Sequence, residues 1–480
     1  MNEHRRKGQT NGIEPSHNNN TFCAQPGKAV IPPSNEGLML HDDGLSDLEQ
    51  QKSTATSLIG RSIGVQCDNP VDLTPNSVIF VVKPSVDAVV HTRWSPVDPH
   101  TFLVASDRPE FYSVSSTITR STVVSQINIS QSMLNEPAMV TALTWISATD
   151  AVLAMWNESA NVVEGDLASS KVVMLRSLGT EATVMSSVVQ VVFALRWQAE
   201  TKRLLGVCGN DLNGAVWVWD AATSNTSHFL PLGSPVLDAV WTTGSLCCVC
   251  GQNFLRIYKV GDKIDPYRSF STKTFWEQVK YDEAERVIAC ISFEQNKFGF
   301  IKENGTEIET VDLNDGNSTV MEFQPRPAVS NDIATSKASI SKILAIAFDS
   351  GVIQLRDARH PNNVVRRLRM DVPAMAIAFS PNGRLLAAAG LDSIAVWSEE
   401  GGIIPQASWR APIEQWITDG SGDDTEAGLD HGLSWNSDGQ KLIYTVGNQV
   451  STPLRHVSGS STSDQIDYSL TFEGCGIVIR

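Results

Sequence analysis

The sequence lacks the features that would place this chain in a membrane, in a secretory route or in a disulfide-stabilised class. It contains no run of about 18 apolar residues, which a membrane-spanning helix requires. The first ten residues, MNEHRRKGQT, include no apolar segment, so we expect no secretory signal peptide. Eight cysteines are scattered over 480 residues. Several fall inside predicted strands, which favours buried, reduced thiols over a disulfide framework.

Signatures of catalysis and of metal binding are also missing. The chain has no G-x-x-x-x-G-K-[ST], G-x-S-x-G or H-E-x-x-H motif. Cys247 and Cys250 form a C-x-x-C pair, but residues i and i+3 of a strand point to opposite faces and so cannot bind one ion. We therefore expect a non-enzymatic protein without a metal or cofactor. A propeller enzyme with its site at the channel mouth, near Arg108, is the weaker alternative.

Positive charge is scarce as well. The chain has 53 acidic and 37 basic residues and a net charge of −16. Phosphate contacts need a basic surface, so direct binding to nucleic acid is not expected. An acidic surface suits basic partners such as histone tails, although acidity that serves only solubility is an equal alternative.

The chain does contain one aromatic frame that recurs every 40 to 56 residues, at the end of a short and mostly apolar run. The residue two positions earlier is apolar in every frame except the first, where it is Thr92. Residues i and i+2 share one face of a strand, so each frame predicts a half-buried strand. The frame aromatics are Trp94, Trp145, Trp197, Trp241, Tyr281, Phe323, Phe379 and Trp435.

Each frame is followed by turn chemistry and further strands. After Phe379, for example, come the turn SPNGR, the small apolar run LLAAAG and the strand SIAVW. Units of about 40 residues with three or four strands are typical of propeller blades. A β-sandwich is the alternative, but its turns would not carry one frame eight times. The sequence thus predicts an all-β propeller with eight blades, or seven as the alternative.

The two ends of the chain differ from this repeat. Residues 1–75 are polar without periodicity, and we expect them to be disordered. The propeller is expected over 76–456, followed by a C-terminal tail at 457–480. Either the strand at 77–82 or the run at 469–479 could complete the last blade, since an unpaired edge strand is a liability.

The order of the frames resembles that of the transducin β-like WD-repeat subunits of histone deacetylase corepressor complexes, over about residues 77–455. The matching segments are FALRW with AVWVWDAATS, then SPVLDAVW, and FDSG followed by AIAFSPNGRLLAAAG. Trp219-Asp220 is the only intact WD dipeptide. The resemblance implies an eight-bladed WD40-type propeller, a nuclear location, and deacetylase corepressor subunits as partners.

The chain also departs from that family. The Gly-His dipeptide that opens a WD repeat is absent, and Tyr112, Tyr258 and Arg356 replace third-strand tryptophans. The buried His-Asp-Ser/Thr-Trp relay is therefore mostly lost, and Asp349 and Asp392 are expected to be partly solvated. No LisH dimerisation pattern is present, which leaves the oligomeric state open.

These departures keep two other interpretations of function in play. The chain could be an adaptor of a ubiquitin ligase or a trafficking complex, with a cytoplasmic location, or a paralogue that has lost its complex. Arg5, Arg6 and Lys7 could act as a nuclear import signal, although three basic residues also occur by chance.

Two surfaces are candidates for partner binding. The first is an acidic insertion in which aromatic rings and carboxylates could hold a Lys- or Arg-rich peptide; its residues are Trp409, Trp416, Asp419, Asp423, Asp424 and Glu426. Its alternative is a solvated loop whose tryptophans pack on a blade. The second is a ring of turn residues at the channel mouth, whose alternative role is turn capping; these are Asp107, Arg108, Asn157, Asn210, Asn253, Asp349 and Asp392.

Overall fold

Strands make up all the regular structure in the described part of the chain. The computed structural model describes residues 70–73, 77–82, 91–105, 109–114, 121–126, 138–156, 170–188, 190–209, 213–223, 225–325, 342–390, 392–399, 401–410, 429–448 and 474–479. All of them belong to one unit, Lys52–Arg480. Within these ranges, no helix has the length and apolar character needed to cross a membrane.

The described strands form eight sheets, here called blades 1 to 8, and the first four follow one another along the chain. Blade 1 comprises β3 (His91–Trp94), β4 (Thr101–Ala105), β5 (Glu110–Val114) and β6 (Ser121–Gln126). Blade 2 comprises β7 (Met139–Trp145), β8 (Ala151–Trp156), β9 (Ser170–Arg176) and β10 (Glu181–Val188). Blade 3 comprises β11 (Val191–Gln198), β12 (Arg203–Gly209), β13 (Gly214–Asp220) and β14 (Asn225–Pro231). Blade 4 comprises β15 (Val236–Trp241), β16 (Leu246–Val260) and β17 (Ile264–Phe275).

The last four blades repeat the pattern, and the final two recruit strands from the N-terminal side. Blade 5 comprises β18 (Gln278–Asp282), β19 (Val287–Ser292), β20 (Lys297–Lys302) and β21 (Glu309–Asp312). Blade 6 comprises β22 (Ser318–Phe323), β23 (Ile343–Phe348), β24 (Val352–Asp357) and β25 (His360–Arg369). Blade 7 comprises β26 (Ala376–Phe379), β27 (Leu385–Ala389), β28 (Ser393–Ser398), β29 (Ala407–Arg410) and β1 (Val71–Asp72). Blade 8 comprises β30 (Leu429–Trp435), β31 (Leu442–Asn448), β32 (Gly474–Ile479) and β2 (Ser77–Val82).

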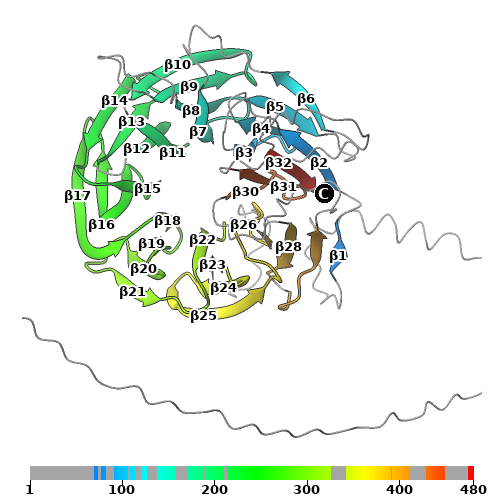
Figure 1. Cartoon of the computed structure of the whole chain (residues 1–480). Helices are drawn as coiled ribbons and strands as arrows, with labels where there is room; N and C mark the ends of the chain where they lie inside the picture. Colours follow the sequence, from blue (N-terminus) through cyan, green and yellow to red (C-terminus); the bar gives the residue numbers. More distant parts are fainter. Residues whose placement is uncertain are drawn as a thin grey trace, which may run out of the picture. The chain divides into compact units, whose positions relative to one another are not determined.

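The blades form a closed ring around a central channel. The first strand of each blade lies innermost, as Figure 1 shows for β11, β15, β18 and β22. Each innermost strand contacts the next one along the chain, and β30 of blade 8 returns to β3 of blade 1. The prediction of an eight-bladed β-propeller is thus confirmed for the described residues.

Blade 4 contains three strands, but the long strand β16 is folded into a hairpin, so the chain crosses this sheet four times. Val260 N, at the end of β16, donates to the oxygen of Ser245, just before its beginning, over 2.8 Å. The strand therefore doubles back at Gln252 and Asn253, where Asn253 has a positive φ of 64°. Such a φ is typical of a two-residue hairpin turn.

The recurring aromatic frame holds adjacent blades together at the inner rim. Trp145 Nε1 of blade 2 donates to the backbone oxygen of Arg93 in blade 1 over 3.2 Å. The same bond joins Trp241 to the oxygen of Arg196, Trp435 to that of Ala378 and Trp94 to that of Ser434, over 2.8, 3.0 and 3.1 Å. In each case the acceptor is the residue just before the aromatic of the preceding blade. Each acceptor residue is also paired with the second strand of its own blade, as Arg93 is with Leu103, so the indole N–H is an additional donor to that carbonyl.

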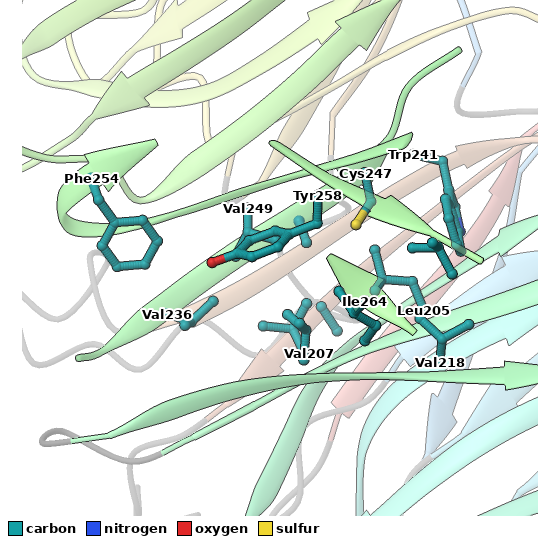
Figure 2. Packing of buried hydrophobic residues seen from close by; sticks show 14 residues of the cluster. Leu205, Val207, Val218, Val236, Trp241, Cys247, Val249, Phe254, Tyr258 and Ile264 are labelled. Carbon is teal, nitrogen blue, oxygen red and sulfur yellow. The ribbon is translucent and has the colours of Figure 1, made fainter. Parts of the chain in front are cut away.

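The core lies between neighbouring blades rather than in one central mass. Figure 2 shows the cluster between blades 3 and 4, where Leu205 and Val218 meet Trp241, Cys247 and Tyr258. Thr92, the exception to the apolar pattern, is also buried, and its hydroxyl lies 3.2 Å from that of Thr445 in blade 8. A hydrogen bond thus compensates for the polar side chain at this position.

Both candidate closing strands take part in ring closure. β32 pairs antiparallel with β31 on one side and with β2 on the other, with Gly476 aligned with Thr445 and with Phe80. Blade 8 therefore joins the two ends of the propeller in a single sheet. In addition, β1 pairs in parallel with β29 and extends the outer edge of blade 7.

Candidate functional site

The predicted ring of turn residues falls on one face of the propeller. Asn253, Asp349 and Asp392 each lie in the turn between the second and third strands of their blade. In a closed ring of blades that run outward in the same order, all such turns share one face. The other four members, Asp107, Arg108, Asn157 and Asn210, lie outside the described residues.

Asp349 caps the loop that leads into its own blade. Its Oδ1 accepts from the backbone N of Asn317 over 2.8 Å, and its Oδ2 accepts from Asn317 Nδ2 over 2.7 Å. Gly316, the residue before Asn317, has a φ of 117°, and a Cβ at this position would lie 2.6 Å from Asp349 Oδ1. The geometry gives Asp349 the turn-capping role that was the alternative to partner binding. Asp349 and Asp392 are both partly exposed, as the missing histidine relay led us to expect.

Of the six candidate residues in the acidic insertion, Trp409 is the one within the described part of the chain. Trp409 lies in β29, opposite Ile394, and is 1% exposed within the core between blades 7 and 8. Its ring is therefore a core side chain, which corrects the prediction that it contacts a partner. Trp416, Asp419, Asp423, Asp424 and Glu426 lie outside the described residues.

A buried polar network occupies the place of the third-strand tryptophan in blade 6. Arg356 of β24 is 3% exposed, donates through Nε to Gln354 Oε1 over 2.8 Å and lies 5.4 Å from the centre of the Phe298 ring. Asp315 Oδ2 accepts from Gln354 Nε2 over 2.5 Å and from Arg367 Nε over 2.8 Å. Burial, together with the positive charge of Arg367, lowers the pKa of Arg356 to about 10. The guanidinium stays charged at neutral pH, so this network supports the fold and offers no general base.

Blade 8 has a shorter relay of the same kind. His431 Nδ1 lies 2.8 Å from the hydroxyl of Tyr444, which in turn donates to the backbone oxygen of Gly390 in blade 7. Since that hydroxyl donates to Gly390, Nδ1 carries the proton and donates to Tyr444. Burial lowers the pKa of His431 to about 4, so the imidazole is neutral at pH 7.

The cysteine pair behaves as the strand geometry predicts. Cys247 packs between blades 3 and 4, whereas Cys250 packs with Cys248 and Cys290 between blades 4 and 5. Burial raises the pKa of Cys247 to about 12, so its thiol is protonated at neutral pH. Across the described ranges, no group of three or more His, Cys, Asp or Glu side chains is arranged to hold a metal ion.

The innermost strands carry a set of charged side chains that the sequence reasoning missed. We call the residues just before the frame aromatics the channel belt; they are Arg93, Thr144, Arg196, Val240, Lys280, Glu322, Ala378 and Ser434. Six of the eight are polar or charged, although each stands between apolar or buried neighbours at the frame. This alternation is the sequence signal that could have identified the belt.

Two ion pairs link belt residues to the neighbouring blade. Lys280 Nζ of blade 5 lies 2.5 Å from Glu322 Oε2 of blade 6, so belt side chains of adjacent blades reach each other. Arg196 Nη2 of blade 3 lies 2.7 Å from Asp238 Oδ1 of blade 4. Asp238 Oδ2 also accepts from the backbone N of Val279 in blade 5 over 3.1 Å. One carboxylate, 6% exposed, thus joins three innermost strands.

Arg93 differs from the other two belt cations. Its side chain is exposed, and within the described ranges it has no ion pair or side-chain hydrogen bond. The pKa of Arg93 is lowered by desolvation and by the charge of Arg196, while Glu322 opposes this change. Arg196 and Glu322 belong to blades 3 and 6, neither of which adjoins blade 1. All three residues stand at the equivalent position on the innermost strand of their blades.

Comparison with known proteins supports the fold alone. No protein-family model and no curated protein sequence matches the chain. Among solved structures, the chain is similar to the C-terminal WD40 domain of Sif2, with a TM-score of 0.58 and 13% sequence identity. The match covers 84% of this chain and 99% of that one. The chain therefore has the fold of a WD40-type β-propeller.

Proposed function

We propose that this protein is a non-enzymatic scaffold that binds other proteins in a histone deacetylase corepressor complex in the nucleus. The observation that carries the proposal is the ring of eight blades, in which the frames follow one another in the order that resembles the transducin β-like subunits. A WD40-type propeller offers a wide rigid surface with turns on two faces, which suits simultaneous contacts with several proteins. The polar clusters in the described interior serve the fold.

The charge of the channel belt affects where a basic histone tail would bind. Three cations and two carboxylates, those of Asp238 and Glu322, give the described belt region a charge of 3 − 2 = +1. A basic tail is repelled there, whereas the chain as a whole carries a charge of −16. Histone tails are therefore expected at the acidic insertion at 409–430 rather than in the channel.

The experiment that tests the proposal is affinity purification of the tagged full-length chain from nuclear extract, followed by mass spectrometry. A deacetylase recovered with its SANT-type partners supports the corepressor role. Recovery of cullin-type or coat-type proteins supports the alternative of a different adaptor, and recovery of no partner contradicts the scaffold role.

A second experiment tests the acidic insertion. The double variant Asp423→Lys and Asp424→Lys is expected to weaken binding of a histone H3 or H4 tail peptide by at least about tenfold, because two attractive charges become repulsive. Asp262→Lys with Asp265→Lys changes the net charge equally at the outer turn of blade 4 and serves as the control. If wild type and both double variants bind the peptide with equal affinity, the insertion is not the histone site.

A further inference from the structure

Arg93 is held in a fixed place on the channel belt. Its backbone oxygen accepts the indole N–H of Trp145, the same bond that fixes Arg196, Ala378 and Ser434 in their blades. On β3, Arg93 pairs with Leu103 and lies between the buried residues Thr92 and Trp94. Its backbone is thus anchored on the innermost strand, while its side chain is exposed.

The other belt charges are already neutralised. Arg196 is matched by Asp238 and Lys280 by Glu322, over 2.7 and 2.5 Å. Within the described ranges, this leaves Arg93 as a cation with no carboxylate and no hydrogen-bond acceptor of its own. A guanidinium has five N–H donors in a planar fork, and that fork matches two oxygens of a carboxylate or a phosphate.

The neighbours of Arg93 on the belt suit the same chemistry. Thr144 of blade 2 and Ser434 of blade 8 occupy the equivalent positions on either side of it. Both carry hydroxyl groups, which can donate to an anionic oxygen, and no belt carboxylate lies on either of these two blades. Glu322, the belt carboxylate, is on blade 6.

We propose that the central channel binds an oxyanion, the carboxylate or phosphoryl group of a ligand, through the Arg93 guanidinium, with the Thr144 and Ser434 hydroxyls beside it. The site does not depend on which complex the chain belongs to. It selects for negative charge in a molecule whose net charge is strongly negative, so binding is local to the channel and is not a general attraction. In low-dielectric confinement such a charge-assisted, bidentate contact is stronger than on an open surface.

The test is isothermal titration calorimetry of the full-length protein at low salt with two probes, inorganic pyrophosphate and a Glu-rich decapeptide. Wild-type protein is expected to bind at least one probe. Pyrophosphate binding without peptide binding identifies a small phosphorylated ligand, and the reverse identifies an acidic peptide segment. Binding of neither probe overturns the proposal.

Substitutions locate the binding within the molecule. Arg93→Gln is expected to weaken binding by tenfold or more, and Arg93→Lys by less, because lysine keeps the charge and loses the fork. Arg359→Gln removes the same charge at an exposed ion pair with Glu285 and is expected to leave affinity unchanged. Thermal unfolding of each variant shows that it is folded. Equal affinity of wild type and folded Arg93→Gln overturns the proposal.

Discussion

At the inner rim, hydrogen bonds from individual tryptophan indole N–H groups link adjacent blades. Trp241 donates to the oxygen of Arg196 over 2.8 Å, whereas Trp276 is fully buried and its Nε1 has no acceptor within the described ranges. Both rings can be replaced by phenylalanine with a similar loss of volume. The two positions therefore separate the hydrogen bond from the packing of the ring.

Trp241→Phe is expected to lower the free energy of unfolding by about 1 kcal/mol more than Trp276→Phe does, because it removes the hydrogen bond from the indole to the Arg196 carbonyl of the preceding blade. Urea denaturation followed by circular dichroism measures both values. A larger loss in Trp276→Phe would mean that the indole bonds do not stabilise the ring.

Two histidines give the protein a defined acid sensitivity. Burial lowers the pKa of His431 from 6.5 to about 4, and burial together with the charge of Arg93 does the same for His91. Between these pH values the unfolded chain binds more protons than the folded chain. Their contribution to stability is therefore complete above pH 6.5 and is lost as the pH falls toward 4.

The free energy of unfolding is expected to fall by about 1–3 kcal/mol per histidine between pH 6.5 and 4. The His431→Phe variant is expected to show a shallower pH dependence than wild type in the same range. Denaturant titrations at a series of pH values test this, and identical slopes for the two proteins would exclude His431 as a contributor.

At the scale of elements, arginines on the outermost strands fasten one blade to the next. Arg268 of β17 donates through Nη1 to the oxygen of Glu303 over 2.7 Å, which joins blade 4 to blade 5. Arg366 of β25 donates to the oxygen of Gly401 over 2.6 Å and joins blade 6 to blade 7 in the same way. These bonds act at the outer rim as the tryptophan bonds act at the inner rim.

Arg268→Met and Arg366→Met are each expected to destabilise the protein by about 1–2 kcal/mol, because a charge-assisted hydrogen bond to a backbone oxygen is lost. Arg359→Met removes an exposed ion pair and is expected to change stability by less than about 1 kcal/mol. The three melting temperatures can be compared directly. If Arg359→Met lowers the melting temperature as much as the other two variants do, the hydrogen bonds between blades stabilise the protein no more than an exposed ion pair does.

Local pattern was enough to predict the strands but not the contacts between blades. The frame aromatics and the apolar residues two before them mark the innermost strands, because side-chain alternation is a property of a single strand. Arg268 and Arg366 carry no such signal, since their acceptors are backbone oxygens of the next blade. For Trp409 the sequence left open whether the ring contacts a partner or packs on a blade, and its place in β29 against the core matches the second alternative.

At the scale of the whole molecule, ring closure depends on two segments that are distant in sequence. Periodicity suggested each of them as a closing strand, but strand pairing is a three-dimensional property, and the two lie side by side in blade 8. Because β32 is hydrogen-bonded on both sides, it is an interior strand of that sheet. Its backbone N–H groups are therefore needed for closure.

Gly476→Pro removes one of these N–H groups and is expected to lower the melting temperature and to promote aggregation through the released edges. Gly476→Ala keeps the N–H group and is the matched control. Thermal scans with light scattering measure both effects. Equal behaviour of the two variants would indicate that β32 does not close the ring.

We propose that the propeller is a scaffold that recruits a deacetylase and does not itself deacetylate. The most direct measurement is deacetylation of an acetyl-lysine peptide by two samples, the assembly isolated with the tagged chain from nuclear extract and the recombinant chain alone. Hydroxamate-sensitive activity is expected in the first sample and none in the second. Activity in the recombinant chain, or its absence from the isolated assembly, would contradict it.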